Sequence, residues 1–380
     1  MDQSSKRLLS LDFFRGATVA AMILVNNPGD WGHIYSPLEH AEWHGCTPTD
    51  LIFPFFLFIV GVSIAYATGT KKNDPAAHGK IILKAFKRSL ILFGLGLFLS
   101  LFPLIFTDPV EAFQTVRIPG VLQRIAVVFF VSSVLFLKNS EKGLFRIAVV
   151  ILAVYWVLMT FIPVPGIGFP NLEKESNLGA WLDRTLLTEA HLWKMAKTWD
   201  PEGILSTLPA IATGLFGVLT GIYLKRKDMD EPTKVAWLFS AGTTAVVLGL
   251  LWGLAFPINK SLWTSSYVLL CAGLAIMVLA LSYWIIDIKK YSAFTPPFIA
   301  YGVNAITVFF LSGLIPRLLD MIKVSNADGT DMGLQAWMYE SFFRPNFTPV
   351  NASLAWAICF NLFWFIILWI MYRKKIIIKV

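Results

Sequence analysis

Three of the five histidines in this 380-residue chain lie in one short segment, at His33, His40 and His44, and an acidic residue, Asp50, follows them. Neutral imidazole accepts protons near neutral pH because its pKa is about 6.5, and a neighbouring carboxylate can orient it. The pattern therefore indicates acid–base chemistry. Two other interpretations stay open. Asp50 follows Thr47-Pro48-Thr49 and could simply cap a helix. A zinc site is the alternative for the histidines, but they lack a settled ligand spacing, so we expect no metal.

The composition places these residues in a membrane protein. Hydrophobic residues make up 56% of the chain, charged residues only 15%, and the mean hydropathy is +0.64, whereas a soluble domain carries about 25% charged residues. Stretches of about 18–25 apolar residues can each cross a bilayer as a helix. Ten are present: 11–28, 50–69, 88–107, 118–137, 145–164, 203–224, 234–256, 262–286, 296–319 and 353–372. We predict an all-α, polytopic helical bundle with about ten transmembrane helices, formed as a single domain over residues 1–380.

The basic residues predict the topology of this bundle. Twenty-one of the 32 lysines and arginines fall at the two termini or in alternate connections between the apolar stretches, while the long loops 29–49, 165–202 and 320–352 hold few. By the positive-inside rule, both termini are cytoplasmic and the long loops face outward. The net charge of +8 is thereby explained without nucleic-acid binding. The first apolar stretch has no evident cleavage site, so we expect a retained helix in a bacterial inner (cytoplasmic) membrane.

Polar residues at the ends of the apolar stretches are the second candidate site signal, because an ionisable group in lipid costs a few kcal/mol unless it is paired or hydrated. Asp12 and Arg15 lie at the inner end of the first stretch, three residues apart. Arg117 and Arg124 are seven apart, as on one helix face; Asp200 precedes Pro201 as an N-cap would; Lys260 could be an interfacial side chain. Most of these polar residues converge on the outer end; the set is Asn26, Asn27, Arg117, Arg124, Asp200, Glu202, Asn259, Lys260 and, inside the stretch 296–319, Asn304.

Several blocks of this sequence resemble one enzyme family. LLSLDFFRG, ILVNNPG and EHAEWHGCTPTDLIFPFFLFIVG occur within residues 8–63; VRIPGVLQR, DPEGIL, FPINKSLWTSSY and YGVNAI follow in order. The series resembles the heparan-α-glucosaminide N-acetyltransferase family over nearly the whole chain. The resemblance implies transfer of acetyl from acetyl-CoA to the amine of a glucosamine-type sugar. It also implies that His40 is the catalytic histidine, with Asn26 and Asp50 beside it. Animal members of the family have Asn where this chain has His44.

The expected mechanism is direct attack of the amine on the thioester. His40 would be the general base, Asp50 would orient it, and Asn26 would position the acetyl group or stabilise the oxyanion. The rival is a ping-pong route with an acetylated His40. Inner-side Arg15 is a candidate for the phosphates of acetyl-CoA, and outer-side Arg117 and Arg124 are the alternative. The expected substrate- and cofactor-binding residues are Arg15, Arg117, Arg124, Glu202, Asn259, Lys260, Trp263 and Asn304.

Two other classes of protein stay open on residue patterns. A secondary transporter of an amino sugar would also place polar residues inside helices, although no matched pair of broken helices is evident in two halves of the chain. A structural membrane protein would not need the clustered outer polar residues. The sequence does not specify which amino sugar is the acceptor, and it leaves a homodimer open.

Overall fold

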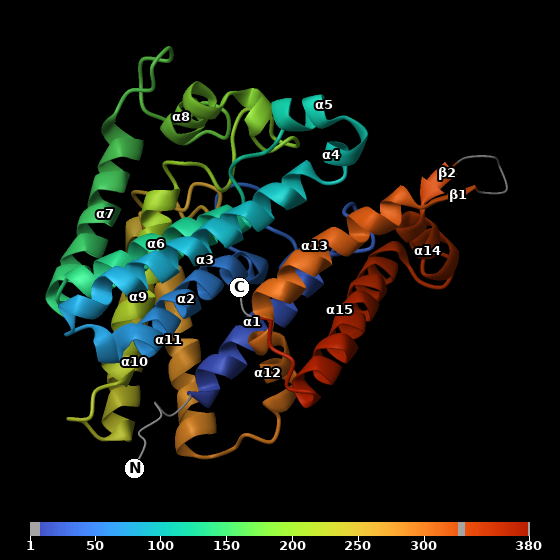
Figure 1. Cartoon of the computed structure of the whole chain (residues 1–380). Coiled ribbons are helices and arrows are strands. Elements are labelled where there is room, and N and C mark those ends of the chain that lie inside the picture. The colour runs from blue at the N-terminus through green and yellow to red at the C-terminus, as the bar shows by residue number, and fades with distance from the viewer. Residues whose placement is uncertain (1–7, 326–330, 379–380) are drawn as a thin grey trace.

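The computed structural model describes residues 8–325 and 331–378, and this part of the chain is a bundle of helices with one small pair of antiparallel strands (Figure 1). The long helices are α1 (Leu9–Asn26), α2 (Ile52–Thr68), α3 (Pro75–Leu101), α6 (Val121–Lys138), α7 (Glu141–Phe161), α9 (Thr207–Leu224), α10 (Glu231–Gly253), α11 (Ser265–Ser282), α13 (Ala305–Met321) and α15 (Pro349–Arg373). The prediction of an all-α, polytopic membrane protein is confirmed.

Short elements connect these helices. They are η1 (Ser36–Leu38), η2 (Pro48–Leu51), η3 (Gly69–Lys71), α4 (Leu104–Thr107), α5 (Pro109–Gln114), α8 (Leu178–Leu187), η4 (Glu189–His191), the π-helical turn η5 (Tyr283–Ile288), α12 (Pro296–Val303) and α14 (Leu334–Phe342). Strands β1 (Lys323–Ser325) and β2 (Asp331–Gly333) pair antiparallel and project from the side of the bundle together with α14 (Figure 1).

The described residues contain eight helices long and apolar enough to cross a membrane, or nine if the bent pair α12–α13 forms one span. The sequence predicted about ten. The difference lies at 88–107, which the structure does not form as one helix. Lys84, Lys87 and Arg88 stand on the same helix, α3, as its apolar part. This helix ends at Leu101 because the next residue, Phe102, precedes Pro103 and takes the extended conformation that a following proline favours.

The predicted helix 296–319 is broken. α12 and α13 meet at 76°, and Asn304 lies at the break, outside both helices. Its side-chain amide donates to the carbonyl of Ile376 at 3.0 Å, and its carbonyl accepts from the backbone amide of Ile378 at 2.9 Å. Asn304 was expected inside a helix near the outer site. Instead, it binds the backbone that follows α15, because an unwound turn in a membrane protein needs a polar partner.

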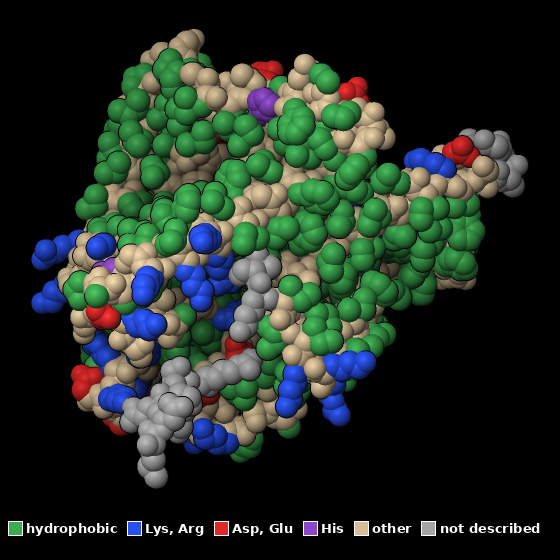
Figure 2. Space-filling model, in the orientation of Figure 1, with side chains coloured by type: hydrophobic (Ala, Val, Ile, Leu, Met, Phe, Trp, Pro, Cys, Tyr) green, Lys and Arg blue, Asp and Glu red, His purple; other side chains and the backbone are tan. Residues whose placement is uncertain are grey.

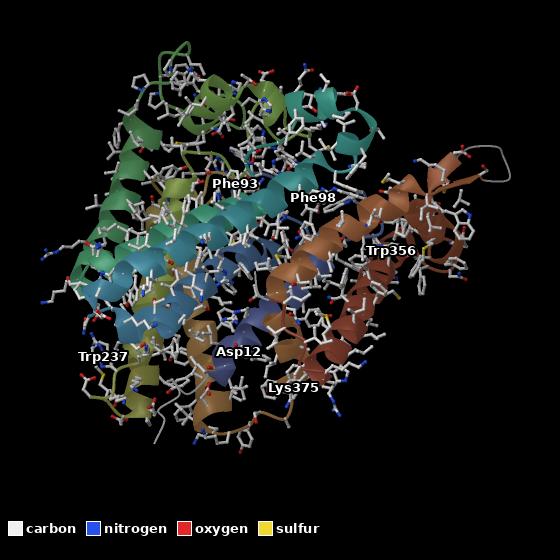
Figure 3. All side chains as sticks on the ribbon, viewed as in Figure 1. Asp12, Phe93, Phe98, Trp237, Trp356 and Lys375 are labelled. Atoms are coloured by element: carbon white, nitrogen blue, oxygen red, sulfur yellow. The ribbon has the colours of Figure 1, made fainter. Side chains whose placement is uncertain are left out.

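Close backbone contacts hold the central helices together. A Cβ added at Gly61 of α2 would lie 2.0 Å from the carbonyl oxygen of Gly214 on α9, and one at Gly217 would lie 2.0 Å from that of Phe58. Small residues of this kind let membrane helices pack by direct backbone contact. The outer helices α10 and α15 bury less of their surface than the central helices do. Trp237 on α10 is exposed, while Trp356 on α15 is covered locally by α14 (Figure 3).

The two ends of the bundle differ in character. The loop end, defined by segments 27–47, 162–206 and 254–264, is tied together by hydrogen bonds from Trp43 Nε1 to the Leu172 carbonyl and from the Gly45 amide to the Ile258 carbonyl. α4, α5 and α8 also lie at this end, at the top of Figure 1. On the face drawn in Figure 2, lysines and arginines gather toward the opposite, basic end. Because α2, α6, α9 and α11 all begin at the loop end, their first turns can share one site.

Candidate active site

His40 and Asp50 form a hydrogen-bonded pair at the loop end. His40 Nδ1 lies 2.7 Å from Asp50 Oδ1, and the other carboxylate oxygen accepts from the backbone amides of Ala41 at 3.1 Å and Thr47 at 2.9 Å. The Asp50 side chain is buried, whereas that of His40 is 44% exposed. A buried carboxylate with this many donors is rigid, so it fixes the imidazole through Nδ1 and leaves Nε2 without a carboxylate partner among the described contacts.

Asp50 is held by the local structure that starts α2. Thr47 and Asp50 form a capping box around η2, each side chain bonding the backbone of the other residue. Tyr267 Oη, on α11, donates to the Asp50 carbonyl at 2.5 Å. Asp50 therefore takes part in capping, as the third residue of a box whose N-cap is Thr47, and the same carboxylate also binds His40. Tyr267 and Thr47 were missed as site residues. The Thr47-x-x-Asp50 spacing signals the box, whereas no local pattern points to Tyr267.

Lys260 brings a positive charge to the same pair. Its Nζ lies 3.0 Å from His40 Nε2, 3.1 Å from His40 Nδ1 and 4.0 Å from Asp50 Oδ1. The side chain is only 20% exposed. Burial lowers the pKa of Lys260, and the carboxylates of Glu202 and Asp50 oppose that effect. Lys260 is thus an enclosed part of the site and not an interfacial side chain reaching for water.

Asn259 shapes the turn that carries Lys260. Its Oδ1 accepts from the Leu262 amide at 2.8 Å, its own amide donates to Thr264 Oγ1 at 3.1 Å, and its Nδ2 lies 3.3 Å from His44 Nδ1. These bonds close the 259–264 turn before α11. Asn259 is therefore a fully buried structural residue that also touches the second histidine.

Trp263, within this turn, packs against Arg124 of α6. Trp263 Nε1 donates to Thr213 Oγ1 on α9 at 3.1 Å, and the Arg124 guanidinium stands 5.1 Å from the centre of the Trp263 ring. Arg124 Nη2 also donates to the Gly203 carbonyl and to Ser206 Oγ. Within the described chain, Arg124 Nε and Nη1 are buried without a hydrogen-bond partner. These contacts join α6, α9 and the 259–264 turn into one support for the site.

Arg117 holds two acidic residues of the same end. Its Nε and Nη2 donate to the Asp200 carboxylate at 2.8 and 2.6 Å, and Nη2 reaches Glu202 Oε2 at 2.5 Å. Burial opposes the charge, but the hydrogen bonds that Arg117 donates to Asp200 and the negative charge of Glu202 raise the pKa of Arg117. Both carboxylates are largely buried, so this cluster is a buried three-charge network.

Two expectations about this network were wrong. Arg117 and Arg124 do not share a helix face, because Gly120 precedes the first turn of α6 and Arg117 lies in the extended segment before it. Asp200 is not the N-cap of the following helix, because α9 begins only at Thr207. Asp200 instead accepts from the Glu202 amide at 2.9 Å and pairs with Arg117.

The remaining predicted residues lie elsewhere. Asn26 is exposed at the last residue of α1 and takes no part in the described hydrogen bonds among His40, Asp50 and Lys260. Arg15 lies near the start of α1, where it pairs with Asp12 at 3.3 Å and donates to Ser63 Oγ on α2 at 2.8 Å. The expected Asp12–Arg15 pair is confirmed. Arg15 and Asn304 are not part of the loop-end site.

Asp183 on α8 is a further buried acid near this site, and no sequence pattern marked it. It accepts from the Ile204 amide at 2.9 Å. Burial raises the pKa of Asp183 to about 7, although the Ile204 amide opposes the shift.

Asp183 should make stability depend on pH. Because the pKa of Asp183 is higher in the folded than in the unfolded state, its protonated carboxyl favours the folded state. This contribution to the free energy of unfolding is complete below the unfolded pKa of about 3.9. It is lost, at about 1.4 kcal/mol per pH unit, as pH rises toward about 7. Thermal melting of wild type and Asp183→Asn in detergent, from about pH 4 to 8, measures this. The wild type should lose stability relative to the variant across that range; parallel curves would contradict the assignment.

The fold and the site together define a class of protein. It is a polytopic helical membrane protein with a histidine–aspartate pair and an enclosed lysine at one end of its bundle. The family model for heparan-alpha-glucosaminide N-acetyltransferase, catalytic, matches residues 7–234. The heparan-alpha-glucosaminide N-acetyltransferase of Mus musculus is 30% identical, over 80% of this chain and 53% of the relative; that of Homo sapiens is 29% identical, over 98% and 60%. The chain therefore belongs to the heparan-alpha-glucosaminide N-acetyltransferase family, as the resemblance indicated. It spans little more than half the length of these relatives.

Proposed function

We propose that this protein is a membrane N-acetyltransferase that moves acetyl from acetyl-CoA to the amine of a glucosamine-type sugar. The observation that carries the proposal is the His40–Asp50 pair, 2.7 Å between Nδ1 and Oδ1, in a chain of this family. The carboxylate is buried and the imidazole is partly exposed. Such a pair presents a base to a reactant while its own partner stays out of water.

The chemistry needs a base, a thioester and an amine within reach of each other. With Nδ1–H donated to Asp50, Nε2 carries the lone pair that takes the proton from the attacking amine. The amine nitrogen bonds to the acetyl carbon, the carbon–sulfur bond breaks, and the sulfur of CoA leaves with the electron pair and then gains a proton. Asp50 stabilises the imidazolium that forms in between. Lys260 adds positive charge where the carbonyl oxygen becomes an oxyanion.

The charges of the site favour entry of acetyl-CoA from the basic end. At the loop end, Arg117 is neutralised by Asp200 and Glu202, and Arg124 is enclosed beneath Trp263. Arg15 lies near the start of α1, away from the loop end. We therefore assign CoA phosphates to the Arg15 side and the acceptor to the loop end, where Asn26 is also exposed. With the basic end cytoplasmic, acetyl would cross an inner membrane to an outer-facing sugar.

Direct transfer and a ping-pong route differ in one intermediate. Direct transfer needs acetyl-CoA and the sugar together, whereas ping-pong leaves acetyl on His40 as an acyl-imidazole. The buried Asp50 hydrogen bond holds His40 as a base, so direct transfer is the version proposed here.

The test is an acetylation assay with the full-length protein in detergent, acetyl-CoA and a panel of amino sugars, with products read by mass. We expect an N-acetylated product from glucosamine or a glucosamine-ended glycan, and none from glucose, which lacks the amine. Absence of product from every amino sugar, together with counterflow of sugar in vesicles without acetyl-CoA, would replace this proposal with transport.

A further inference from the structure

The protein carries a primary amine of its own beside the proposed base. Lys260 Nζ lies 3.0 Å from His40 Nε2. A general base takes a proton from a group about 2.6–3.2 Å away, and Nζ is at this distance from Nε2. Nζ is also 3.1 Å from Nδ1, so it stands over the imidazole face and must turn toward the in-plane lone pair of Nε2 to give up its proton. The structure therefore contains an internal amine next to the position where the sugar amine must react.

The backbone keeps Lys260 in this place. The Thr264 amide donates to the Asn259 carbonyl at 3.1 Å, and the Trp263 amide donates to the Lys260 carbonyl at 3.0 Å. The 259–264 turn is thus closed on both sides of the lysine. Because its Cα is fixed and its side chain is largely covered, Nζ has few alternative positions away from His40.

The surroundings of Lys260 favour a reactive amine. His40 and Asp50 contact it, and the charges of Glu202 and Arg124 and the thiol of Cys46 also act on it electrostatically. Burial lowers the pKa of the ammonium and outweighs the two carboxylates. Compared with a surface lysine, a larger share of Lys260 is therefore the free amine at neutral and mildly alkaline pH.

We propose that Lys260 is a self-acetylation site, which the bound acetyl-CoA modifies when no acceptor amine occupies the loop end. This inference rests on the proposed function, because it uses the same base and the same donor. Lys260 Nζ bonds to the acetyl carbon, the carbon–sulfur bond breaks, and its electron pair leaves on the sulfur of CoA. The proton lost by Nζ passes to His40 and then to the thiolate, giving N-acetyl-lysine and CoA.

Self-acetylation would switch the site off. The amide is neutral and stable, so it neither transfers acetyl onward nor supplies positive charge beside His40. It also fills the space next to Nε2. A sugar amine competes with Lys260 for the same acetyl group, so the acceptor protects the enzyme. Activity would then persist only while acceptor is present.

The experiment incubates full-length protein in detergent with carbon-13-labelled acetyl-CoA and no sugar, and maps labelled lysines by peptide mass. We expect Lys260 to be labelled at least about tenfold faster than Lys174, a loop-end lysine that is 40% exposed and pairs with Glu42. Labelling should rise with pH as the free amine increases, and glucosamine should suppress it. The label should survive hydroxylamine, which removes an acyl-imidazole.

Two variants provide controls. In His40→Gln, labelling of Lys260 should fall to the rate of Lys174, since the base is gone while a polar partner for Asp50 remains. Lys260→Arg keeps a positive charge that acetyl-CoA does not modify. Its activity, whatever its starting level, should not decay during preincubation with acetyl-CoA, whereas that of the wild type should decay in step with the label.

Each outcome separates this inference from the proposed function. A sugar product with Lys260 unlabelled in the absence of acceptor overturns self-acetylation and leaves the acetyltransferase standing. Labelled Lys260 without any sugar product supports self-acetylation and overturns the proposed acceptor class. Equal labelling in wild type and His40→Gln shows uncatalysed modification and overturns the inference. Neither label nor product overturns both.

Discussion

Replacing His40 with alanine should lower the rate of acetyl transfer by about two to four orders of magnitude, the usual contribution of a positioned base. The variant keeps the fold, because His40 is a partly exposed loop residue whose main partner is a single carboxylate. The measurement is kcat for N-acetylation of the amino sugar at saturating acetyl-CoA, together with the KM for each substrate. Loss should appear in kcat, since the proton is taken only as the amine attacks.

His44→Ala is the matched control for this prediction. His44 stands in the same segment, but it contacts Asn259 and has no carboxylate partner among the described hydrogen bonds. We expect its variant to retain most of the activity. Full activity in His40→Ala, combined with loss in His44→Ala, would show that the second imidazole is the base.

Replacing Arg117 with methionine should give the largest loss of stability among single substitutions of the charged residues at the loop end. It leaves the buried carboxylates of Asp200 and Glu202 without their shared cation. Breaking a buried charge network by removing one partner typically costs about 3–5 kcal/mol, because the remaining charges stay out of water. Unfolding by SDS titration in mixed micelles measures the free-energy difference.

Arg344→Met is the control for burial. Arg344 pairs with Glu340 at 2.8 Å, but its side chain is 64% exposed, and water screens such surface pairs so that they contribute little to stability. A loss at Arg117 no larger than that at Arg344 would mean that water reaches Asp200 and Glu202. Asp200→Asn in the Arg117→Met background should recover part of the loss, because one uncompensated charge is removed.

The helix count illustrates a limit of hydropathy. Hydropathy averaged over a stretch does not show where the backbone leaves the helix. For this reason 88–107 and 296–319 were each predicted as one span. Phe102 before Pro103 ends α3, and the break at Asn304 bends α12 from α13 by 76°. In the second case the deciding partner is the backbone at residues 376–378, far along the chain, which no local window includes.

The sequence by itself determined that this protein lies in a lipid bilayer, and it determined the local chemistry around Asp50. Apolar stretches long enough for a bilayer require helices, and the spacing of Thr47 and Asp50 defines a capping box that presents a carboxylate near His40. These are short-range consequences of hydrogen bonding and hydropathy. Only the tertiary structure decided that Lys260, 220 residues away, lies against His40. Likewise, it paired Arg117 with Asp200 instead of aligning it with Arg124. Buried charges select partners by distance in space, and that distance is set by how the helices pack.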